Sequence, residues 1–375
     1  MKRWILLALL ALTNHANAGE TTWRERVEIF WKYFEKNAPA YRDAIIDGKN
    51  KLTMMDRMSQ SMSMGGLARG WNLDRDKDKN VIRVMTSVPR DRADRILLAH
   101  WKARAPQLVG WEFQTHIPRR ELKAWKDYEG VEYQPGDFRV SVAVRVAARK
   151  VDLRISHPKV ESRQSVAFQM LSHVLQNSIG EHTFADYIAT IEHAADPGDD
   201  SLALPDLRKQ VEAILNEHQW PVATDIMTAW TVYEQLPDVS EGAARSDVVA
   251  GSTLDLKLIK NYAGDREIKG LGEFGATLAY VTLSHERFTA GKQAAQRSAM
   301  QDLLDAALMN ASAGRVIGGA HGTKNAYIDL VFFDEAAGVP IVKKFLRESD
   351  VVPSATLRFF ATARRDEAQV LKQSR

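Results

Sequence analysis

Cysteine is absent from the 375-residue chain. Its absence excludes disulfide bonds, thiolate metal sites, cysteine catalysis and lipid attachment through a cysteine. Beyond the first residues, no stretch approaches the roughly 20 apolar residues that a membrane-spanning helix requires. An excess of one charge is also lacking, because 51 Lys and Arg residues stand against 48 Asp and Glu residues. This balance gives no electrostatic reason to expect a nucleic-acid-binding protein.

The first 18 residues have the pattern of a secretory signal peptide. Lys2 and Arg3 form a basic start, residues 4–12 are apolar, and Ala16 and Ala18 place small residues at the positions before a cleavage site. The apolar part is too short to cross a bilayer as a helix. Cleavage after Ala18 would leave 49 basic residues against 48 acidic ones, since only two basic residues are removed. We therefore expect a protein of the Gram-negative periplasm, or one secreted beyond it.

The distribution of tryptophan predicts two domains. No tryptophan follows Trp230, which indicates two units with different cores. The polar segment 195–206 contains Pro, Gly and a run of Asp, a composition typical of a linker. The predicted fold class is α+β, with an N-terminal domain at 19–194 and a C-terminal domain at 207–375.

The N-terminal domain is expected to be a mixed α/β sandwich that opens with a helix. Thr22 and Glu25 fit a capping box, in which each side chain accepts the other residue's backbone N–H. The apolar residues that follow recur on one helical face. Residues 137–146 and 150–157 alternate apolar and polar side chains, which predicts a hairpin. A helix is predicted from residue 162 and beyond Gly180 to residue 193.

The C-terminal domain is expected to be a ferredoxin-like sandwich. Helices are predicted at 204–217 and 220–235. Strands are then predicted at 276–286, 315–321, 325–334 and 355–363, and helices at 292–310 and 339–349. The resulting order βαββαβ is that of a split-βαβ fold, in which two helices cover one face of an antiparallel sheet.

Five of the eleven methionines lie between residues 53 and 71, a pattern that sometimes indicates a Cu(I) site. However, Met54, Met58 and Met62 are four residues apart and fall on one helical face. No histidine lies near them in the sequence, and Met fills irregular core space well. The pattern favours the buried face of a helix over a copper site.

Three polar residues near the end of the N-terminal domain are candidate metal ligands. On a continuous helix, His182, Asp186 and His193 would project from one side and could hold Zn²⁺ with one position open for water. The alternative is an ordinary amphipathic helix, because apolar residues with helical spacing are interleaved with them. No cofactor is predicted.

Four further residues are candidate binding residues. The glycine-rich segment 318–325 carries His321 and Lys324 in what is predicted to be a hairpin loop, and flexible loops with such side chains do bind ligands. Its spacing is not that of a phosphate-binding P-loop. Trp23 and Trp31 are candidates because tryptophan often anchors protein interfaces.

Two family resemblances add to these predictions. The segments "FWKYFEKN", "APQLVGWEFQTHIP" and "IGEHTFADYIATIE" resemble a family of uncharacterised exported bacterial proteins, over roughly residues 25–195. The βαββαβ order and the hairpin "GGAHGTKNAYIDLVFFD" are similar to domains related to the protein regulator of ribonuclease E activity, type B. This second resemblance implies a small protein-binding sandwich that modulates a partner without catalysis of its own.

Two functions of different classes remain open from the sequence. The first is an exported protein-binding or inhibitory module, for example of the immunity type, whose partner is another periplasmic protein. The second is a periplasmic hydrolase or metal-dependent enzyme with an unrecognised site. The sequence has neither a G-x-S-x-G nor an H-E-x-x-H motif, and it specifies no partner identity or oligomeric state.

Overall fold

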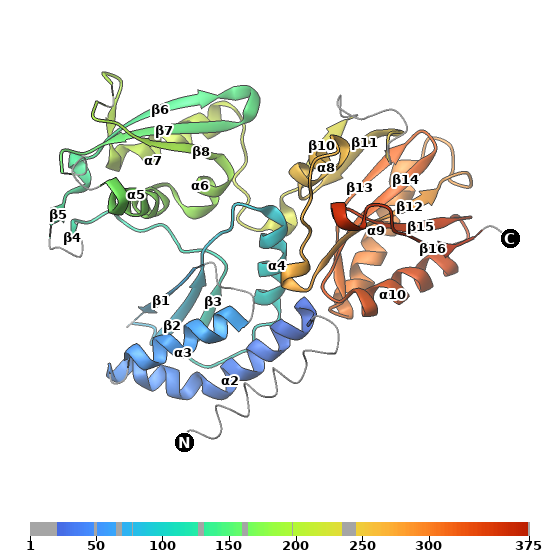
Figure 1. Cartoon of the computed structure of the whole chain (residues 1–375), viewed down its shortest axis with the longest axis horizontal. Coiled ribbons are helices and arrows are strands. Elements are labelled where there is room, and N and C mark those ends of the chain that lie inside the picture. The colour runs from blue at the N-terminus through green and yellow to red at the C-terminus, as the bar shows by residue number, and fades with distance from the viewer. Residues whose placement is uncertain are drawn as a thin grey trace. The chain divides into compact units, whose positions relative to one another are not determined.

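The chain is a mixed α+β protein, as the sequence predicts (Figure 1). The computed structural model describes residues 21–48, 51–64, 70–76, 78–126, 131–159, 164–196, 198–234 and 245–373. The predicted signal peptide lies outside these residues. Within the described part of the chain, no helix is both long and apolar enough to cross a membrane.

The chain divides into two compact units, and the division differs from the one the sequence suggests. Unit 1 combines Met1–Ala68 with Met227–Arg375, and unit 2 is Arg69–Ile226. The start of the chain belongs with its C-terminal part because of backbone pairing. The N–H of Trp23 donates to the carbonyl of Gly275 at 2.9 Å, and the N–H of Arg24 donates to the carbonyl of Phe333 at 3.0 Å.

The segment 195–206 lies within unit 2 instead of joining two domains. It contains strand β9 (Leu202–Ala203), which pairs with Arg139 and Val140 of a four-stranded sheet. Helix α7 (Leu204–Glu217) follows directly and packs on the same sheet. The Pro- and Asp-rich composition therefore marks a surface turn between two elements of one core.

Unit 1 begins with two helices whose sequence signals are confirmed. Helix α2 (Trp23–Asp47) starts at the predicted capping box, in which Thr22 and Glu25 accept each other's backbone N–H. Helix α3 (Lys51–Met64) contacts α2 along its length. Its methionines at positions 54, 58 and 62 are all buried, as the four-residue spacing predicts.

A seven-stranded antiparallel sheet forms the rest of unit 1, in the order β10-β11-β13-β14-β12-β15-β16 (Figure 1). Its helices are α8 (Leu256–Ala263), α9 (Gln293–Asn310) and α10 (Glu335–Glu348). The strands are β10 (Thr231–Glu234), β11 (Val248–Thr253), β12 (Thr277–Ser284), β13 (Gly314–Gly322), β14 (Asn325–Phe332), β15 (Ala355–Phe359) and β16 (Ala368–Lys372). From β12 to β15 the elements follow the predicted order βαββαβ.

The two faces of this sheet are covered differently. On one face, alternate residues of β12, β14 and β15 form an apolar core with α9 and α10. On the other face, α8 packs through Tyr262, whose hydroxyl lies 2.8 Å from the hydroxyl of Tyr280 in β12. The same face buries Asp329 of β14, which pairs with Arg245. Successive side chains of a strand point to opposite faces of the sheet, so residues two apart contribute to the same face.

Unit 2 contains a small three-stranded sheet with one helix. Strand β1 (Trp71–Asp76) pairs antiparallel with β2 (Val81–Thr86), and β2 pairs parallel with β3 (Trp111–Gln114). The parallel step requires a crossover, which helix α4 (Arg92–Ala103) provides. Asp91 caps α4 by accepting the N–H of Ala93.

A four-stranded sheet forms the other core of unit 2, in the order β8-β7-β6-β9. Strands β6 (Arg139–Arg145) and β7 (Lys150–Ser156) are the predicted hairpin. Helices α5 (Gln164–Ile179) and α7 bury their apolar residues against this sheet. A short pair, β4 (Trp125–Lys126) and β5 (Glu132–Tyr133), lies beside them.

Two predicted helices are wrong. The helix expected to run to residue 193 ends earlier, because α6 (Glu181–Tyr187) gives way to strand β8 (Ile188–His193). Strand β8 pairs parallel with β7, and this pairing overrides the local helical pattern. The region 220–235 contains β10, whose Thr, Val and Tyr residues favour an extended chain.

Candidate functional site

The outer edge of β10 is the first candidate site. Strand β10 is the last strand at one end of the seven-stranded sheet, and among the described strands it has a neighbour, β11, on one side alone. Its pairing with β11 is regular from Thr231 to Glu234. The opposite side of this strand therefore presents backbone N–H and C=O groups that another strand can pair with.

One face of β10 carries Val232 and, at the end of the strand, the exposed Glu234. Val232 is 78% exposed, and Trp230, which directly precedes the strand, is 45% exposed. Residues two apart on a strand point to the same face. Val232 lies opposite Ser252 of β11, and Tyr233, which points to the other face, is buried. The edge thus combines open backbone groups with an apolar surface.

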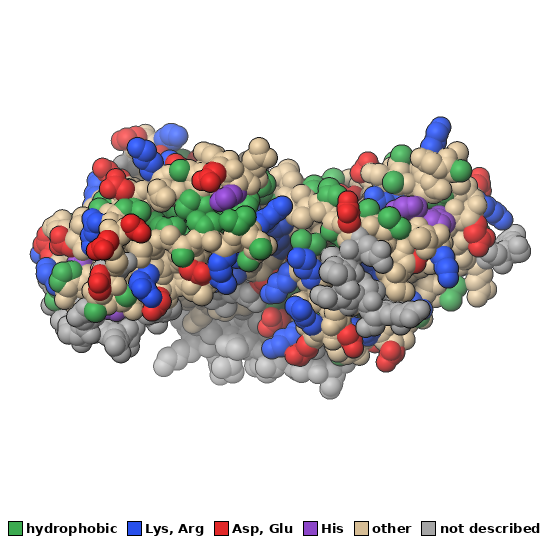
Figure 2. Space-filling model, turned by 90° about the horizontal axis from the view of Figure 1, so that it is seen from above, with side chains coloured by type: hydrophobic (Ala, Val, Ile, Leu, Met, Phe, Trp, Pro, Cys, Tyr) green, Lys and Arg blue, Asp and Glu red, His purple; other side chains and the backbone are tan. Residues whose placement is uncertain are grey.

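The second candidate is a pair of histidines at one end of the sheet in unit 1. His321 is the last residue but one of β13, and His285 follows directly after β12. Their rings lie 5.4 Å apart, centre to centre. The Nε2 atom of His285 lies 3.3 Å from the carbonyl oxygen of Thr323. Figure 2 shows two histidine side chains next to each other at the surface, on the side where Figure 1 places β12 and β13.

The turn between β13 and β14 holds Lys324 and is fixed by Asp247. The backbone N–H groups of Lys324 and Asn325 each donate to Asp247 at 2.9 Å, and the Tyr327 hydroxyl also donates to it. These bonds keep the pKa of Asp247 below its usual value although burial raises it. The predicted hairpin therefore forms, with His321 in strand β13 and Lys324 in a short, well-anchored turn.

In unit 2, helix α6 carries a cluster of charged and titratable side chains. Arg95 of α4 donates to Asp186 at 2.7 Å, and both side chains are buried. Glu181 accepts the backbone N–H of Ile117 at 2.7 Å and that of Val88 at 3.3 Å. Burial nevertheless raises the pKa of Glu181 above its usual value. These contacts tie α6 to the segments around the three-stranded sheet.

His182 lies beside this cluster as a half-buried residue whose two ring nitrogens are buried. Neither of its ring nitrogens has a hydrogen-bond partner among the described residues. Its ring lies 5.2 Å from that of His116. Burial, together with the neighbouring His116 and Arg95, lowers the pKa of His182 to about 4, although the charge of Asp186 opposes them. His182 is thus neutral at physiological pH.

The three candidate metal ligands are not brought together. His182 and Asp186 lie on α6, but His193 lies at the end of β8, because the helix ends at Tyr187. The Asp186 carboxylate is bound by Arg95. Throughout the described residues, no group of three or more His, Asp or Glu side chains has an arrangement that could hold a metal ion.

Trp23 and Trp31 are core residues. Both belong to the buried face of α2, and they are 1% and 5% exposed. The Trp23 ring packs edge-on against Phe274 at 6.3 Å. The aromatic spacing therefore indicates the interior of the protein and not a binding surface.

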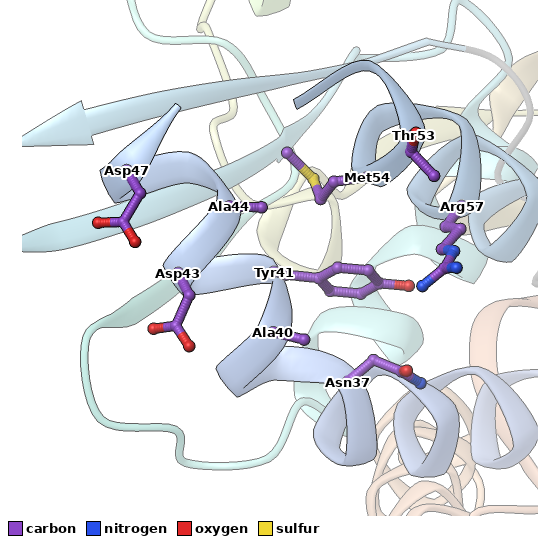
Figure 3. Close-up of a pocket in the computed structure, with 9 residues that line it drawn as sticks. All are labelled: Asn37, Ala40, Tyr41, Asp43, Ala44, Asp47, Thr53, Met54 and Arg57. Atoms are coloured by element: carbon purple, nitrogen blue, oxygen red, sulfur yellow. The ribbon is translucent and has the colours of Figure 1, made fainter. Parts of the chain in front are cut away.

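A groove between α2 and α3 has a volume of about 560 Å³ and is the third candidate. Figure 3 shows the ring of Tyr41 across its centre, with Met54 on one side and the guanidinium of Arg57 near the Tyr41 hydroxyl. Burial raises the pKa of this hydroxyl to about 12. Asp43 and Asp47 line the α2 wall. Charged side chains of both signs, Arg57 against Asp43 and Asp47, line this groove. They favour no particular ligand, so we assign none.

Several residues of these sites have no local signal in the sequence. Val232 and Trp230 lie in a region predicted to be helical, and His285 is brought to His321 by strand pairing. Comparisons with protein-family models, with curated proteins and with solved structures found no match to this chain.

Proposed function

We propose that this chain is an exported protein-binding module without catalysis of its own, and that its partner adds an extended segment along the outer edge of β10. The observation that carries the proposal is the combination at Val232: a 78% exposed valine on an edge strand. The signal-peptide pattern supports a partner in the periplasm. An inhibitory role, for example of the immunity type, is one form of this function.

Edge strands normally carry features that prevent pairing with other chains, such as Lys, Pro or a bulge. Strand β10 has the sequence Thr-Val-Tyr-Glu, and its pairing with β11 from Thr231 to Glu234 has no bulge. Strand addition obtains affinity from main-chain hydrogen bonds and specificity from alternate side chains. A partner strand with apolar residues at every second position would cover Val232 and Trp230.

The strand order supports the ferredoxin-like part of the proposal. Strands β13, β14, β12 and β15 are neighbours in that order, and each pair is antiparallel. Helices α9 and α10 connect them and share one apolar core with the sheet. We propose that residues 277–359 form a ferredoxin-like sandwich that β11 and β10 extend at one edge.

The metal-dependent enzyme is the weaker candidate. It requires a free carboxylate at Asp186, but Arg95 binds this group inside the protein. His193 does not lie on the helix that carries His182. No specific contact in the described residues favours this function over partner binding.

The test compares the same substitution at the two edges of one sheet. Tagged, exported protein is crosslinked in its own cell envelope and purified, and co-purifying proteins are identified. Val232→Lys should reduce recovery of the partner by about 10-fold or more, because it places a charge in an apolar contact. Val370→Lys is the matched control, since Val370 is 49% exposed on β16 at the opposite edge. Equal recovery with both variants would contradict binding at β10.

A further inference from the structure

Arg297 lies beside the His285–His321 pair. It projects from the second turn of α9 under β13, where a Cβ atom on Gly319 would meet its Nη1 at 2.9 Å. The absence of a side chain at Gly319 is what leaves room for the guanidinium. His321 lies two residues after Gly319 on the same strand. Its side chain therefore points to the face of the sheet that α9 covers. Burial lowers the pKa of His321 most, and the positive charge of Arg297 adds to this effect.

Among the described residues, the buried guanidinium of Arg297 has no ion-pair partner of its own. The residue is 9% exposed, and its Nε and Nη1 atoms have no hydrogen-bond partner among the described residues. The charge of Asp329 acts on it, but this carboxylate is already paired with Arg245. A buried, unpaired cation is costly, and native proteins leave few such groups unsatisfied.

The histidine pair offers further groups for the same ligand. The Nδ1 atoms of His285 and His321 are both buried and have no partner in the described part of the chain. Burial lowers the pKa of His321, and the neighbouring His285 and Arg297 lower it further, while Asp247 opposes them. An anion placed among these groups would favour protonation of the imidazoles and would be bound by the resulting N–H donors.

The start of α9 is a fourth feature that favours an anion at this place. The N-cap residue of this 18-residue helix, Lys292, makes no side-chain capping bond. The N-terminus of a helix carries partial positive charge and attracts anions. The helix start, Arg297 and the two histidines belong to the same end of the sheet, where β12 and β13 both finish.

We propose that Arg297, His285 and His321 form a binding site for a phosphate group. Planar Arg with two N–H groups suits the oxygen spacing of phosphate, and charge-assisted bonds of this kind are the stronger ones. A divalent metal between the two imidazoles is the competing occupant. The cation of Arg297 beside them opposes a metal ion and favours an anion.

The test titrates full-length mature protein with inorganic phosphate and follows the imidazole resonances by NMR. Phosphate should shift the resonances of His285 and His321 and raise the pKa of His321 by about 1, because the ligand stabilises its protonated ring. Arg297→Gln should weaken binding by about 10-fold or more, whereas Arg297→Lys should retain part of it. The matched control is Arg287→Gln, which removes the same charge from an exposed residue of the neighbouring loop.

Four outcomes decide the proposal. Shifts of both histidines that depend on Arg297 and not on Arg287 support it. Equal weakening by the two substitutions would show non-specific attraction and overturn it, as would Zn²⁺ binding at the pair without any response to phosphate. If Arg297→Gln fails to fold, His321→Gln in an otherwise native chain tests the same site. Sedimentation with phosphatidylglycerol vesicles that requires Arg297 would place the phosphate group on a lipid.

Discussion

Arg245 and Asp329 form an ion pair inside unit 1, although 84 residues separate them in the chain. Both Asp329 oxygens accept from the guanidinium, and Asp329 is fully buried. The guanidinium also lies 4.9 Å from the centre of the Tyr327 ring and 5.1 Å from that of Tyr280. Burial lowers the pKa of Arg245, but the Asp329 charge more than compensates and raises it. The pair anchors the segment at 245 to the sheet.

Removing one partner of this pair should destabilise the protein strongly. Asp329→Asn leaves a buried guanidinium without its countercharge, and we expect a loss of about 3–5 kcal/mol in the free energy of unfolding. The double variant Arg245→Met with Asp329→Leu should recover much of this loss, because no unpaired charge remains. Denaturant unfolding of the native protein, the single variants Arg245→Met and Asp329→Leu, and the double variant measures the coupling.

The control for this cycle is an exposed pair. Glu348→Gln removes the partner of Lys344 on α10, where both side chains are mostly exposed. Its effect should stay below about 0.5 kcal/mol. An Asp329→Asn variant as stable as the native chain would show that the buried pair contributes nothing.

His182 should make the stability of the protein depend on pH. Its pKa falls from 6.5 to about 4 in the folded state, so the unfolded chain binds the proton more tightly. Stability is therefore fully present above about pH 6.5 and decreases as the pH falls towards 4. Allowing for its partial exposure to solvent, we expect His182 to account for about 2 kcal/mol of this decrease.

Thermal unfolding between pH 7 and pH 4.5 tests this dependence. His182→Leu should flatten the profile, since a leucine fills the buried position without titrating. His193→Gln is the comparison, because it removes a histidine from β8 of the same unit. A His182→Leu profile as steep as the native one would contradict the role given to this residue.

The methionines of α3 should behave as core residues. Met58 is 1% exposed, and Met58→Ala should cost about 2–4 kcal/mol by leaving a cavity. Met58→Leu should cost less than about 1.5 kcal/mol, because it conserves volume. Met55, which is half-buried, provides the comparison for the alanine substitution. Stabilisation of the native protein by added Cu(I), lost in Met58→Leu, would support the copper alternative instead.

Local patterns in the sequence predict much of this fold. The capping box at Thr22 and Glu25, the stripe of α2 and the hairpin β6–β7 all depend on residues close in the chain. The strand–helix order from β12 to β15 also follows from periodicity alone. Helix α7 has the predicted bounds, Leu204–Glu217.

The remaining features depend on contacts between distant segments. Strand β8 follows a helical pattern, and its pairing with β7 is what makes it extended. Helix α2 joins unit 1 through hydrogen bonds from Trp23 and Arg24 to residues about 250 and 310 positions later in the chain. No local spacing indicates such pairs. The β-branched run at Thr231–Val232 and the adjacent Tyr233 are a local signal for β10, because these residue types favour an extended chain.

Photo-crosslinking from position 232 tests the central claim most directly. A photo-reactive amino acid replaces Val232 in the exported, full-length protein, and a second, otherwise identical variant carries it at Val370 on the opposite edge. If β10 is the docking edge, irradiation of intact cells gives one discrete crosslinked product from position 232 and none from position 370. The absence of a product at 232, or equal products at both edges, would contradict partner binding along β10.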